Sequence, residues 1–500
     1  MQKILSAFQL READQFTVLH EPIASIDLME RAATACTNFL RRRFSENTVY
    51  RIFCGPGNNG GDGLAIARQL IEHGNTVYTY SMGSTTPFSE DRTFNLNRLL
   101  RLPNSSHSES SETTGWPSAA ENEVWIDALF GTGLQRPLEG LYKKWVECMN
   151  ESCATRVAID LPSGFMADSF PTTGAVVFKA NITLSFHSPK LTFFLAESAE
   201  VVGEWHILNI GLKEVSQVKR WVLHQEDVKQ RFYIRKRFSH KGTYGHGLLI
   251  AGSNGKYGAA VLAARACLRS GIGLLTVHVP AGARNILQLG APEAMLYVDD
   301  YEDHLTMVQF EISRHQAIGV GPGIGTHEDT VALLHHLIQV GKPLVLDADA
   351  LNILAMNKEW IDKIPAGSIL TPHPKEFERL TRPVQDSVER LELLTTFAMR
   401  HQLTVILKGA YSCIAMPDGR LFFNTTGNAG LARGGSGDVL TGIVLAFLSQ
   451  GYTSEDAALI AVWLHGAAAD RVAASTSMQG MLPSDVIEAL PLLFGELERS

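Results

Sequence analysis

The sequence predicts an α/β protein with two mostly parallel sheets in tandem, each covered by helices on both faces. Apolar, glycine-bounded runs of strand length alternate with helical patterns along almost the whole chain. The 500 residues are too many for one core. The alternation also restarts after about residue 225. We therefore expect a doubly wound domain over residues 1–212, a linker over 213–227 and a second α/β domain over 228–500.

Composition narrows the classes of protein and partner. Hydrophobic residues make up 45% of the chain and charged residues 19%, as in a well-buried globular protein. The net charge of -8 gives no support for binding nucleic acid or an anionic membrane. The six cysteines form no C-x-x-C pair, and neither an apolar leader nor a run of ~18 apolar residues is present. We predict a cytoplasmic protein without nucleic-acid or membrane partners, and a homo-oligomer stays open.

The first domain is expected to contain buried strands in "VYRIFCG", "NTVYTYSMG", "EVWIDALFG" and "TRVAIDLPSG". The segment "LAIARQLIEHG" predicts a helix that ends at Gly74. Residues 104–115 are polar and of low complexity, which predicts a mobile surface loop. The alternation of strands and helices favours parallel pairing, with ligands beyond the carboxyl ends of the strands.

The segment "GPGNNGGDG", residues 55–63, resembles a dinucleotide-binding loop because Gly55, Gly57 and Gly60 fit G-x-G-x-x-G. Its position between a strand and a helix suits an anion, and its glycines are expected to let the backbone approach a ligand. The next strand, however, ends "YTYSMG" without the acid that holds a ribose. This Rossmann-like loop therefore does not predict an ordinary hydride-transfer dehydrogenase.

Two aspartates end strands of the same domain: Asp127 in "EVWID" and Asp160 in "RVAID". Each precedes a turn of small residues, so each could simply cap a turn or a following helix. Because the carboxyl ends of parallel strands meet at one edge, we expect both acids to lie near the glycine loop.

The motifs "LMERAA", "GPGNNGGDG", "DALFGTGLQRP" and "DLPSG" resemble the YjeF N-terminal family, the NAD(P)H-hydrate epimerases, over about residues 1–212. The resemblance implies an oxygen-lined K+ site and Asp160 as the acid/base. The implied K+ ligands are Asn59, Asp127 and Ser163. The implied contacts to the hydrated dinucleotide are Asn58, Asn59, Gly60, Gly61, Asp62, Gly131, Thr132, Gly133, Leu134, Gln135, Arg136, Pro137, Tyr142 and Asp160.

In the second domain, "GGSGDVLTGIVLAFL" carries the strongest signal. Gly434, Gly435 and Gly437 precede Asp438, and apolar residues then recur at helical spacing. A glycine-rich loop that opens a buried helix can hold phosphate, and a carboxylate at its mouth can accept a hydroxyl proton. The alternative is that Asp438 only caps the helix.

Together with "HKGTYGHGLLIAGS", "GVGPGIG", "LDADALN", "TPHPKEF" and "LKGAYS", this loop resembles the YjeF C-terminal family, the ribokinase-like ADP- or ATP-dependent NAD(P)H-hydrate dehydratases. The resemblance covers about residues 228–495. It implies that Asp438 is the catalytic base and that Mg2+ accompanies the nucleotide. It further implies nucleotide contacts at Lys408, Gly409, Ala410, Tyr411, Ser412 and Gly437, and hydrated-dinucleotide contacts at Ala259, Gly323, His373 and Asp438.

The two resemblances together imply a repair enzyme for hydrated NADH and NADPH, NADHX and NADPHX. The first domain would interconvert the R and S epimers, and the second would dehydrate the S epimer with ADP or ATP. Two alternatives stay open. The second domain could be a small-molecule kinase of the ribokinase type, and the first could be a non-catalytic binding module.

Overall fold

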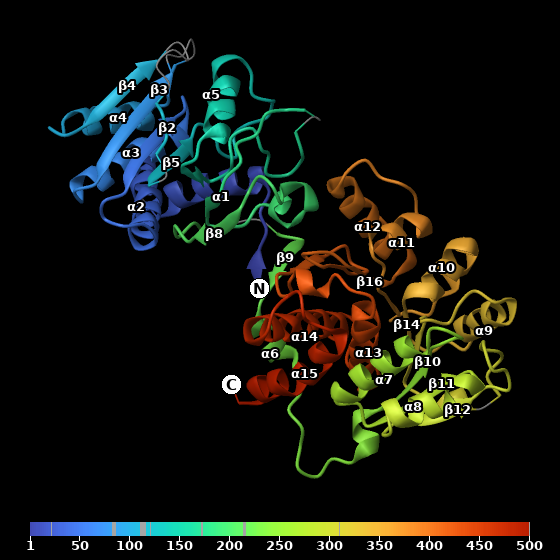
Figure 1. Cartoon of the computed structure of the whole chain (residues 1–500). Helices are drawn as coiled ribbons and strands as arrows, with labels where there is room; N and C mark the ends of the chain where they lie inside the picture. The colour runs from blue at the N-terminus through green and yellow to red at the C-terminus, as the bar shows by residue number, and fades with distance from the viewer. Residues whose placement is uncertain are drawn as a thin grey trace. The chain divides into compact units, whose positions relative to one another are not determined.

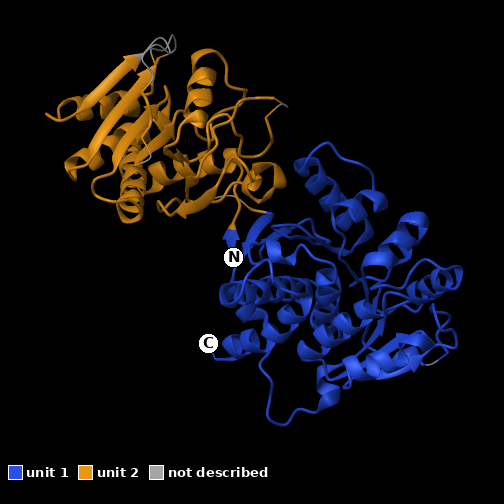
Figure 2. Cartoon of the chain, in the orientation of Figure 1, with its two compact units in different colours: residues 1–2, 219–500 blue, residues 3–218 orange. Residues whose placement is uncertain are grey.

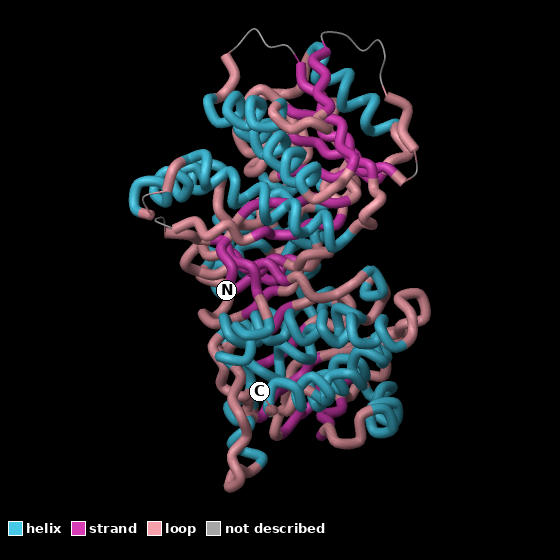
Figure 3. The backbone as a smooth tube through the Cα atoms, turned by 90° about the vertical axis from the view of Figure 1, so that its left-hand side faces the viewer, coloured by secondary structure: helices cyan, strands magenta, loops and turns pink. Residues whose placement is uncertain are grey.

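The computed structural model describes residues 1–499 apart from 22, 83–86, 111–116, 121, 172–173, 214–216 and 310. The chain forms two compact units (Figures 1 and 2). Unit 2 comprises Lys3–Val218, and unit 1 comprises Met1–Gln2 with Lys219–Ser500. Each unit has strands flanked by helices (Figure 3), so the predicted α/β class is confirmed.

Unit 2 contains a seven-stranded sheet of order β4-β3-β2-β5-β6-β7-β8, in which every neighbouring pair is parallel. From β2 the chain winds outward through β3 and β4, then returns to β5 and winds the other way. The reversal lies between β2 and β5, where ligands bind in doubly wound sheets. The strands are β2 Val49–Cys54, β3 Thr76–Met82, β4 Ser106–Ser110, β5 Glu123–Ala128, β6 Thr155–Ile159, β7 Ile182–Phe186 and β8 Glu204–Leu208.

Helices cover both faces of this sheet. One core joins α2 and α3 to the sheet through residues such as Cys36, Leu40 and Leu70. A second core joins α5 to the opposite face through Trp145 and Met149. The central strands β5 and β7 are buried on both faces, which explains their continuous apolar runs. The helices are α1 Ala7–His20, α2 Ser25–Arg43, α3 Asn58–Glu72, α4 Glu90–Leu100 and α5 Gly140–Glu151, with 3-10 turns η1 Leu191–Phe194 and η2 Ala196–Ser198.

The predicted mobile loop over 104–115 is wrong in its first half. Residues 106–110 form β4, which pairs in parallel with β3 at the sheet edge. An edge strand has one neighbour only and tolerates polar side chains, so its sequence does not look like a buried strand. Residues 111–115 lie outside the described residues.

Unit 1 contains an eleven-stranded sheet of order β1-β9-β18-β17-β16-β15-β14-β13-β10-β11-β12. The strands from β12 to β16 are parallel, and β17 runs antiparallel to both its neighbours. Here the winding reverses between β10 and β13. The strands are β1 Gln2–Lys3, β9 Arg220–Leu223, β10 His246–Ile250, β11 Leu274–Val279, β12 Met295–Val298, β13 Ala317–Val320, β14 Leu344–Leu346, β15 Ile369–Leu370, β16 Thr404–Leu407, β17 Cys413–Ala415 and β18 Leu421–Asn424.

Helices α7, α13, α14 and α15 of unit 1 pack together, and α13 also lies against β10, β13 and β14. The helices are α6 Gln225–Arg231, α7 Tyr257–Arg269, α8 Arg284–Gly290, α9 Glu328–Gln339, α10 Ala348–Met356, α11 Pro374–Leu380, α12 Ser387–His401, α13 Ser436–Ser449, α14 Ser454–Ser475 and α15 Pro483–Glu498. By length and composition α14 could cross a membrane, but 67% of its apolar window is buried inside the protein, as in a core helix.

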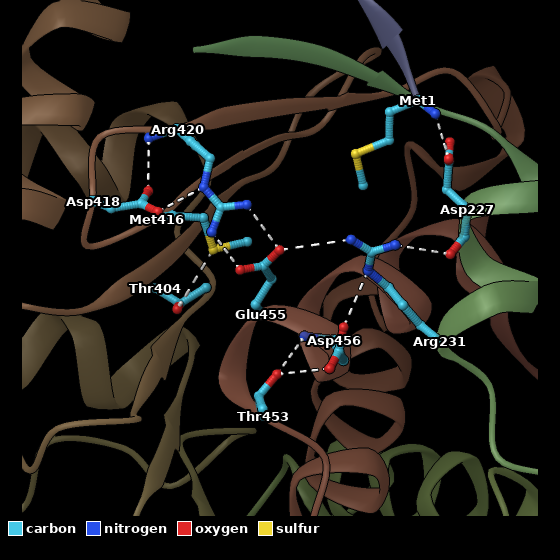
Figure 4. A network of polar contacts seen from close by, with 10 residues as sticks. All are labelled: Met1, Asp227, Arg231, Thr404, Met416, Asp418, Arg420, Thr453, Glu455 and Asp456. Atoms are coloured by element: carbon cyan, nitrogen blue, oxygen red, sulfur yellow. Dashed lines mark hydrogen bonds and ion pairs between the residues drawn. The ribbon is translucent and has the colours of Figure 1, made fainter. Parts of the chain in front are cut away.

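The predicted linker over 213–227 is partly wrong, because β9 and the start of α6 lie within it. Val222 and Leu223 are buried, and β9 pairs in parallel with β18. Figure 4 shows the polar contacts that hold this segment in unit 1: Arg231 lies 3.1 Å from a carboxyl oxygen of Asp456, and Asp227 binds the Met1 amine. Sequence reasoning missed β9 because its short run "RWVL" lies between polar segments.

Two candidate active sites

The first candidate site lies at the reversal point of unit 2, where Asp127 lies at the carboxyl end of β5 and Ser163 lies in the turn after the neighbouring β6. The hydroxyl of Ser163 donates to one oxygen of Asp127 at 2.7 Å, and its backbone N–H donates to the other at 2.7 Å. Both residues are completely buried. Burial raises the pKa of Asp127 to about 6, opposed by the hydrogen bonds from Ser163 and Leu129.

Asn59, in the first turn of α3, belongs to the same loop cluster. Both polar atoms of its side-chain amide are buried and have no hydrogen-bond partner among the described residues. Buried amides are normally satisfied, so these atoms suit a ligand. Asn59, Asp127 and Ser163 offer only oxygen ligands to a cation, and a hard monovalent cation fits this donor set.

Asp160 directly follows β6 and has a left-handed backbone, with φ of 65°. Such a conformation is strained for a residue with a side chain and is often found at functional sites. One carboxyl oxygen accepts a hydrogen bond from the Thr132 N–H at 2.9 Å. The other lies 3.2 Å from Nζ of Lys190. Both carboxyl oxygens are therefore fixed in direction.

The loop "GPGNNGGDG" uses its glycines for close packing more than for the approach of a ligand. A Cβ at Gly55 would lie 1.7 Å from the carbonyl oxygen of Leu129, and one at Gly60 would lie 2.1 Å from that of Gly55. Gly55 and Gly60 are buried, and their contact with a ligand stays a prediction. Asn58 is exposed and remains accessible.

The segment from Gly131 to Pro137 lies beside Asp160. A Cβ at Gly131 would lie 2.7 Å from Oδ2 of Asp160 and 3.4 Å from Cγ of Asn59, so the structure brings the three predicted residues together. Tyr142 contacts this segment through Phe130, with ring centroids 4.8 Å apart. The exposed residues of the segment, Gly133, Gln135 and Arg136, border solvent, and Thr132, Leu134 and Pro137 are half-buried.

Sequence reasoning missed three charged residues at this site. Arg92 of α4 is buried and donates to the carbonyl of Gly55 at 2.8 Å. Asp14 of α1 and Lys190, after β7, both interact electrostatically with Asp160. None of the three lies in a recognisable motif. Asp14 lies in the α1 sequence "READ", which does not differ from an ordinary solvent-facing helix segment and so did not indicate a site.

The second candidate site lies at the carboxyl ends of β13 to β16 in unit 1. Lys408 follows β16, and its Nζ lies 2.7 Å from Oδ1 of Asp347, which follows β14. The hydroxyl of Thr441 on α13 donates to Oδ2 of Asp347 at 2.8 Å. A Cβ at Gly437 would lie 3.3 Å from Nζ of Lys408, so the lysine reaches the start of α13.

Asp438 lies in the first turn of α13, next to this pair. Burial raises its pKa to about 7, and the negative charges of Asp347 and Asp349 add to this while Lys408 opposes it. Asp438 caps no helix through its side chain, because the N-cap position is Gly435, with φ of 98°. A helix N-terminus beside a carboxyl group with a pKa of about 7 suits phosphate binding and proton transfer.

His373 acts as a structural cap as well as a candidate contact. Its Nδ1 accepts hydrogen bonds from the N–H groups of Lys375 and Glu376 at 3.1 and 3.2 Å. Its Nε2 lies 3.4 Å from Glu376, and 43% of the side chain is exposed. One ring nitrogen of His373 is therefore used to cap α11, and the side chain is still partly exposed to a ligand.

The remaining predicted residues of unit 1 fall into two groups. Gly323, with φ of 64°, and Ala259 lie together: a Cβ on the glycine would be 3.2 Å from that of the alanine. In the turn between β16 and β17, the hydroxyl of Ser412 donates to the carbonyl of Gly409 at 3.3 Å. Gly409 and Ala410 are exposed, and Tyr411 and Ser412 are half-buried.

Two family profiles match the chain. Residues 25–192 match the YjeF-related protein N-terminus, and residues 247–492 match the NAD(P)H-hydrate dehydratase profile. A bifunctional NAD(P)H-hydrate repair enzyme from Moorella thermoacetica is 33% identical over 99% of this chain and 97% of its own. The chain belongs to the bifunctional NAD(P)H-hydrate repair enzymes. The resemblance found in the sequence motifs is confirmed.

Other repair enzymes of this family and two solved structures are also similar. The Escherichia coli enzyme is 33% identical over 93% of this chain and 88% of its own. The ADP/ATP-dependent NAD(P)H-hydrate dehydratase from Bacillus subtilis, co-crystallised with ATP/Mg2+, is 33% identical, with 55% of this chain and 98% of that chain covered and a TM-score of 0.48. A ribokinase-like superfamily protein from Enterococcus faecalis is 25% identical, with coverages of 58% and 100% and a TM-score of 0.49.

Proposed function

We propose that unit 2 interconverts the R and S epimers of hydrated NADH and NADPH, and that unit 1 dehydrates the S epimer with a phosphoryl group from ADP or ATP. The observation that carries the proposal is the position of Asp160 and Asp438. Each is a carboxyl group beyond the carboxyl ends of a wound sheet, beside glycine-rich backbone. The family membership supports both activities.

In the proposed epimerase reaction, Asp160 moves protons at the carbon that bears the hydroxyl group and the ring nitrogen. The hydroxyl leaves as water after it receives a proton, the C–O bond breaks, and the nitrogen lone pair forms an iminium. Water then adds from the other face and returns a proton to the protein, so no net charge or atom is gained. Asp160 suits this role because the Thr132 N–H and Lys190 fix its two oxygens.

A potassium ion is proposed at Asn59, Asp127 and Ser163. The unpartnered amide of Asn59 and the fully buried carboxyl group of Asp127 fit a cation, because burial without a counter-charge disfavours the ionised carboxylate. When bound, the ion would supply positive charge that orders the loops around the substrate. Asn58, Asp62, the segment 131–137 and Tyr142 would then line the dinucleotide site.

In the proposed dehydratase reaction, Asp438 accepts the proton of the substrate hydroxyl as the oxygen attacks the terminal phosphorus of the nucleotide. The P–O bond to the leaving nucleotide breaks, giving AMP from ADP or ADP from ATP. The C–O bond of the phosphate ester then breaks and inorganic phosphate leaves, the adjacent carbon gives a proton to the departing phosphate, and the ring double bond is restored. Lys408 and the amides at Gly437 would hold phosphate oxygens.

Mg2+ is proposed to accompany the nucleotide, and the donor chemistry present fits it. Asp347 and Glu376 are carboxyl groups beside Lys408, with Nζ 2.7 and 3.9 Å from their nearest oxygens. Carboxylate oxygens are the ligands Mg2+ prefers. Ala259, Gly323 and His373 would contact the hydrated dinucleotide, and residues 408–412 the adenine nucleotide. All six cysteines are free thiols, which supports the cytoplasmic location we propose.

The proposal is tested with the full chain and a mixture of R and S NADHX in K+ and Mg2+, with ADP and ATP in separate reactions. Full recovery of NADH absorbance is expected with one nucleotide. Recovery that stops at the S fraction would make unit 2 a binding module. A stable phosphorylated product without NADH would make unit 1 a small-molecule kinase.

A further inference from the structure

Lys190 is a buried cation in the epimerase site. Only 1% of its side chain is exposed. Its Nζ donates to the backbone carbonyls of Phe186 and Ser188 at 3.2 and 3.1 Å and lies 3.2 Å from Oδ1 of Asp160. Lysine is almost never fully buried unless it is paired, so the ammonium group is held here at the expense of its hydration.

The backbone before Lys190 is anchored from both sides. His187 has a left-handed backbone, with φ of 61°. The hydroxyl of Ser188 donates to the carbonyl of Lys3 at 2.9 Å and accepts from the Leu5 N–H at 3.0 Å. Since η1 begins directly after Lys190, the turn has little freedom, and the ammonium group has a defined position.

Four acidic groups from four elements act on one another around this position: Asp160 after β6, Asp14 on α1, Asp62 on α3 and the Cys36 thiol on α2. Although part of Asp14 is exposed, desolvation and the charge of Asp160 raise its pKa to about 6, and Lys190 lowers it. Desolvation, followed by the charges of Asp160 and Asp14, raises the pKa of Asp62 well above its ordinary value. For Cys36, desolvation and then Asp62 and Asp160 raise the thiol pKa.

Desolvation and like charges therefore disfavour the ionised forms of Asp14 and Asp62. One ionised and one protonated carboxyl group is the arrangement that epimerisation needs, since a proton must be given and another accepted. Among these acids, it is Asp160 whose carboxyl oxygen lies 3.2 Å from Nζ of Lys190, so the ammonium group fixes the orientation of Asp160 in particular.

We propose that Lys190 is a positioning residue for epimerisation: its ammonium group fixes Oδ1 of Asp160 while the Thr132 N–H fixes Oδ2, so that the carboxyl group is held in one orientation towards the substrate. This inference deepens the epimerase function proposed above and rests on it. Lys190 moves no proton itself in this scheme.

The test replaces Lys190 with methionine and, separately, with glutamine, in the full chain. Lys179→Met is the matched control, because Lys179 is an exposed lysine of the same unit. Epimerisation is followed as the conversion of R NADHX to the S form, which the dehydratase of the same chain consumes in excess nucleotide. We expect kcat to fall about 100-fold or more for both Lys190 variants and KM to change less than about threefold. The control should match the wild type.

A rescue experiment separates positioning from a purely structural role. In a Lys190→Ala variant, added methylammonium should restore part of the activity by occupying the vacated space. Melting curves and dehydratase activity on S NADHX show whether each variant is folded. If the methionine variant has a lowered melting temperature, the glutamine variant is used for the comparison.

The inference is overturned if a folded Lys190 variant keeps a third or more of the wild-type rate. It is also overturned if the rate falls and methylammonium restores nothing, since Lys190 would then be structural. If the wild type itself does not epimerise R NADHX, the proposed function fails and the inference falls with it.

Discussion

Oδ1 of Asp347 lies 2.7 Å from Nζ of Lys408, and Oδ2 of the same carboxylate accepts the hydroxyl of Thr441 at 2.8 Å. Asp347 thus connects the end of β16 to α13 while it is itself 1% exposed. Asp347 therefore positions Lys408, the lysine that would hold phosphate. The two residues lie in separate sequence motifs, and neither motif indicates that they pair.

We expect Asp347→Asn to lower dehydratase kcat/KM about 100-fold, because Lys408 loses its fixed position. The negative charge of Asp347 contributes to the raised pKa of Asp438, so its removal should also move the acid limb of the dehydratase pH profile below that of the wild type. The measurement is NADH recovery from S NADHX between about pH 5 and 9. An acid limb that stays in place would argue against this charge coupling.

Asp438→Asn should abolish dehydratase activity and stabilise the folded protein at high pH. The folded-state pKa of Asp438 is raised from 3.8 to about 7, so the folded state binds this proton more tightly than the unfolded state. The stability that this tighter proton binding gives to the folded state is therefore lost as pH rises from 3.8 to about 7. The variant should melt above the wild type at about pH 8 and close to it at about pH 4, as followed by thermal melts. A variant that melts lower at both pH values would contradict this.

Gly131→Ala should impair epimerisation without affecting dehydration. The added Cβ would lie 2.7 Å from Oδ2 of Asp160 and would push the carboxylate from the Thr132 N–H. A loss of roughly 100-fold in kcat is expected from such a displacement. Gly57→Ala is the matched control, because a Cβ there meets nothing within 4 Å. If Gly57→Ala lowered kcat as much as Gly131→Ala, the loss would come from a general disturbance of the site loops and not from the displacement of Asp160.

Replacing K+ with tetramethylammonium should slow epimerisation, because the larger ion cannot enter the site of Asn59, Asp127 and Ser163. Asn59→Leu should make the rate independent of K+ and low, since the unpartnered amide oxygen of Asn59 is lost. Dehydration of S NADHX in the same chain is the internal control. An Asn59→Leu variant that still responds to K+ would place the ion elsewhere.

The sequence was informative where a motif follows a strand and weak where only the fold joins distant residues. Asp127, Asp160 and Asp438 end strands or open helices, so their places at sheet edges followed from parallel pairing. Lys190 and Asp160 are separated by 29 intervening residues, and they meet only because β6 and β7 are neighbours. In the sequence Asp14 looks like any other acidic residue of a helix, and only the packing of α1 brings it near Asp160. The β4 edge strand and β9 were missed because polar flanks hide short strands.

The chain crosses between the two units twice, after Gln2 and after Val218. In topological terms unit 2 is therefore an insertion near the start of unit 1, tethered at both ends. Expressing residues 219–500 by themselves would remove β1 and uncover the outer edge of β9, leaving unpaired backbone groups that invite self-association. A variant in which Met1–Lys3 is fused to residues 219–500 through a short linker would keep that edge covered. Comparing its solubility with that of residues 219–500 would measure what the two residues of β1 contribute.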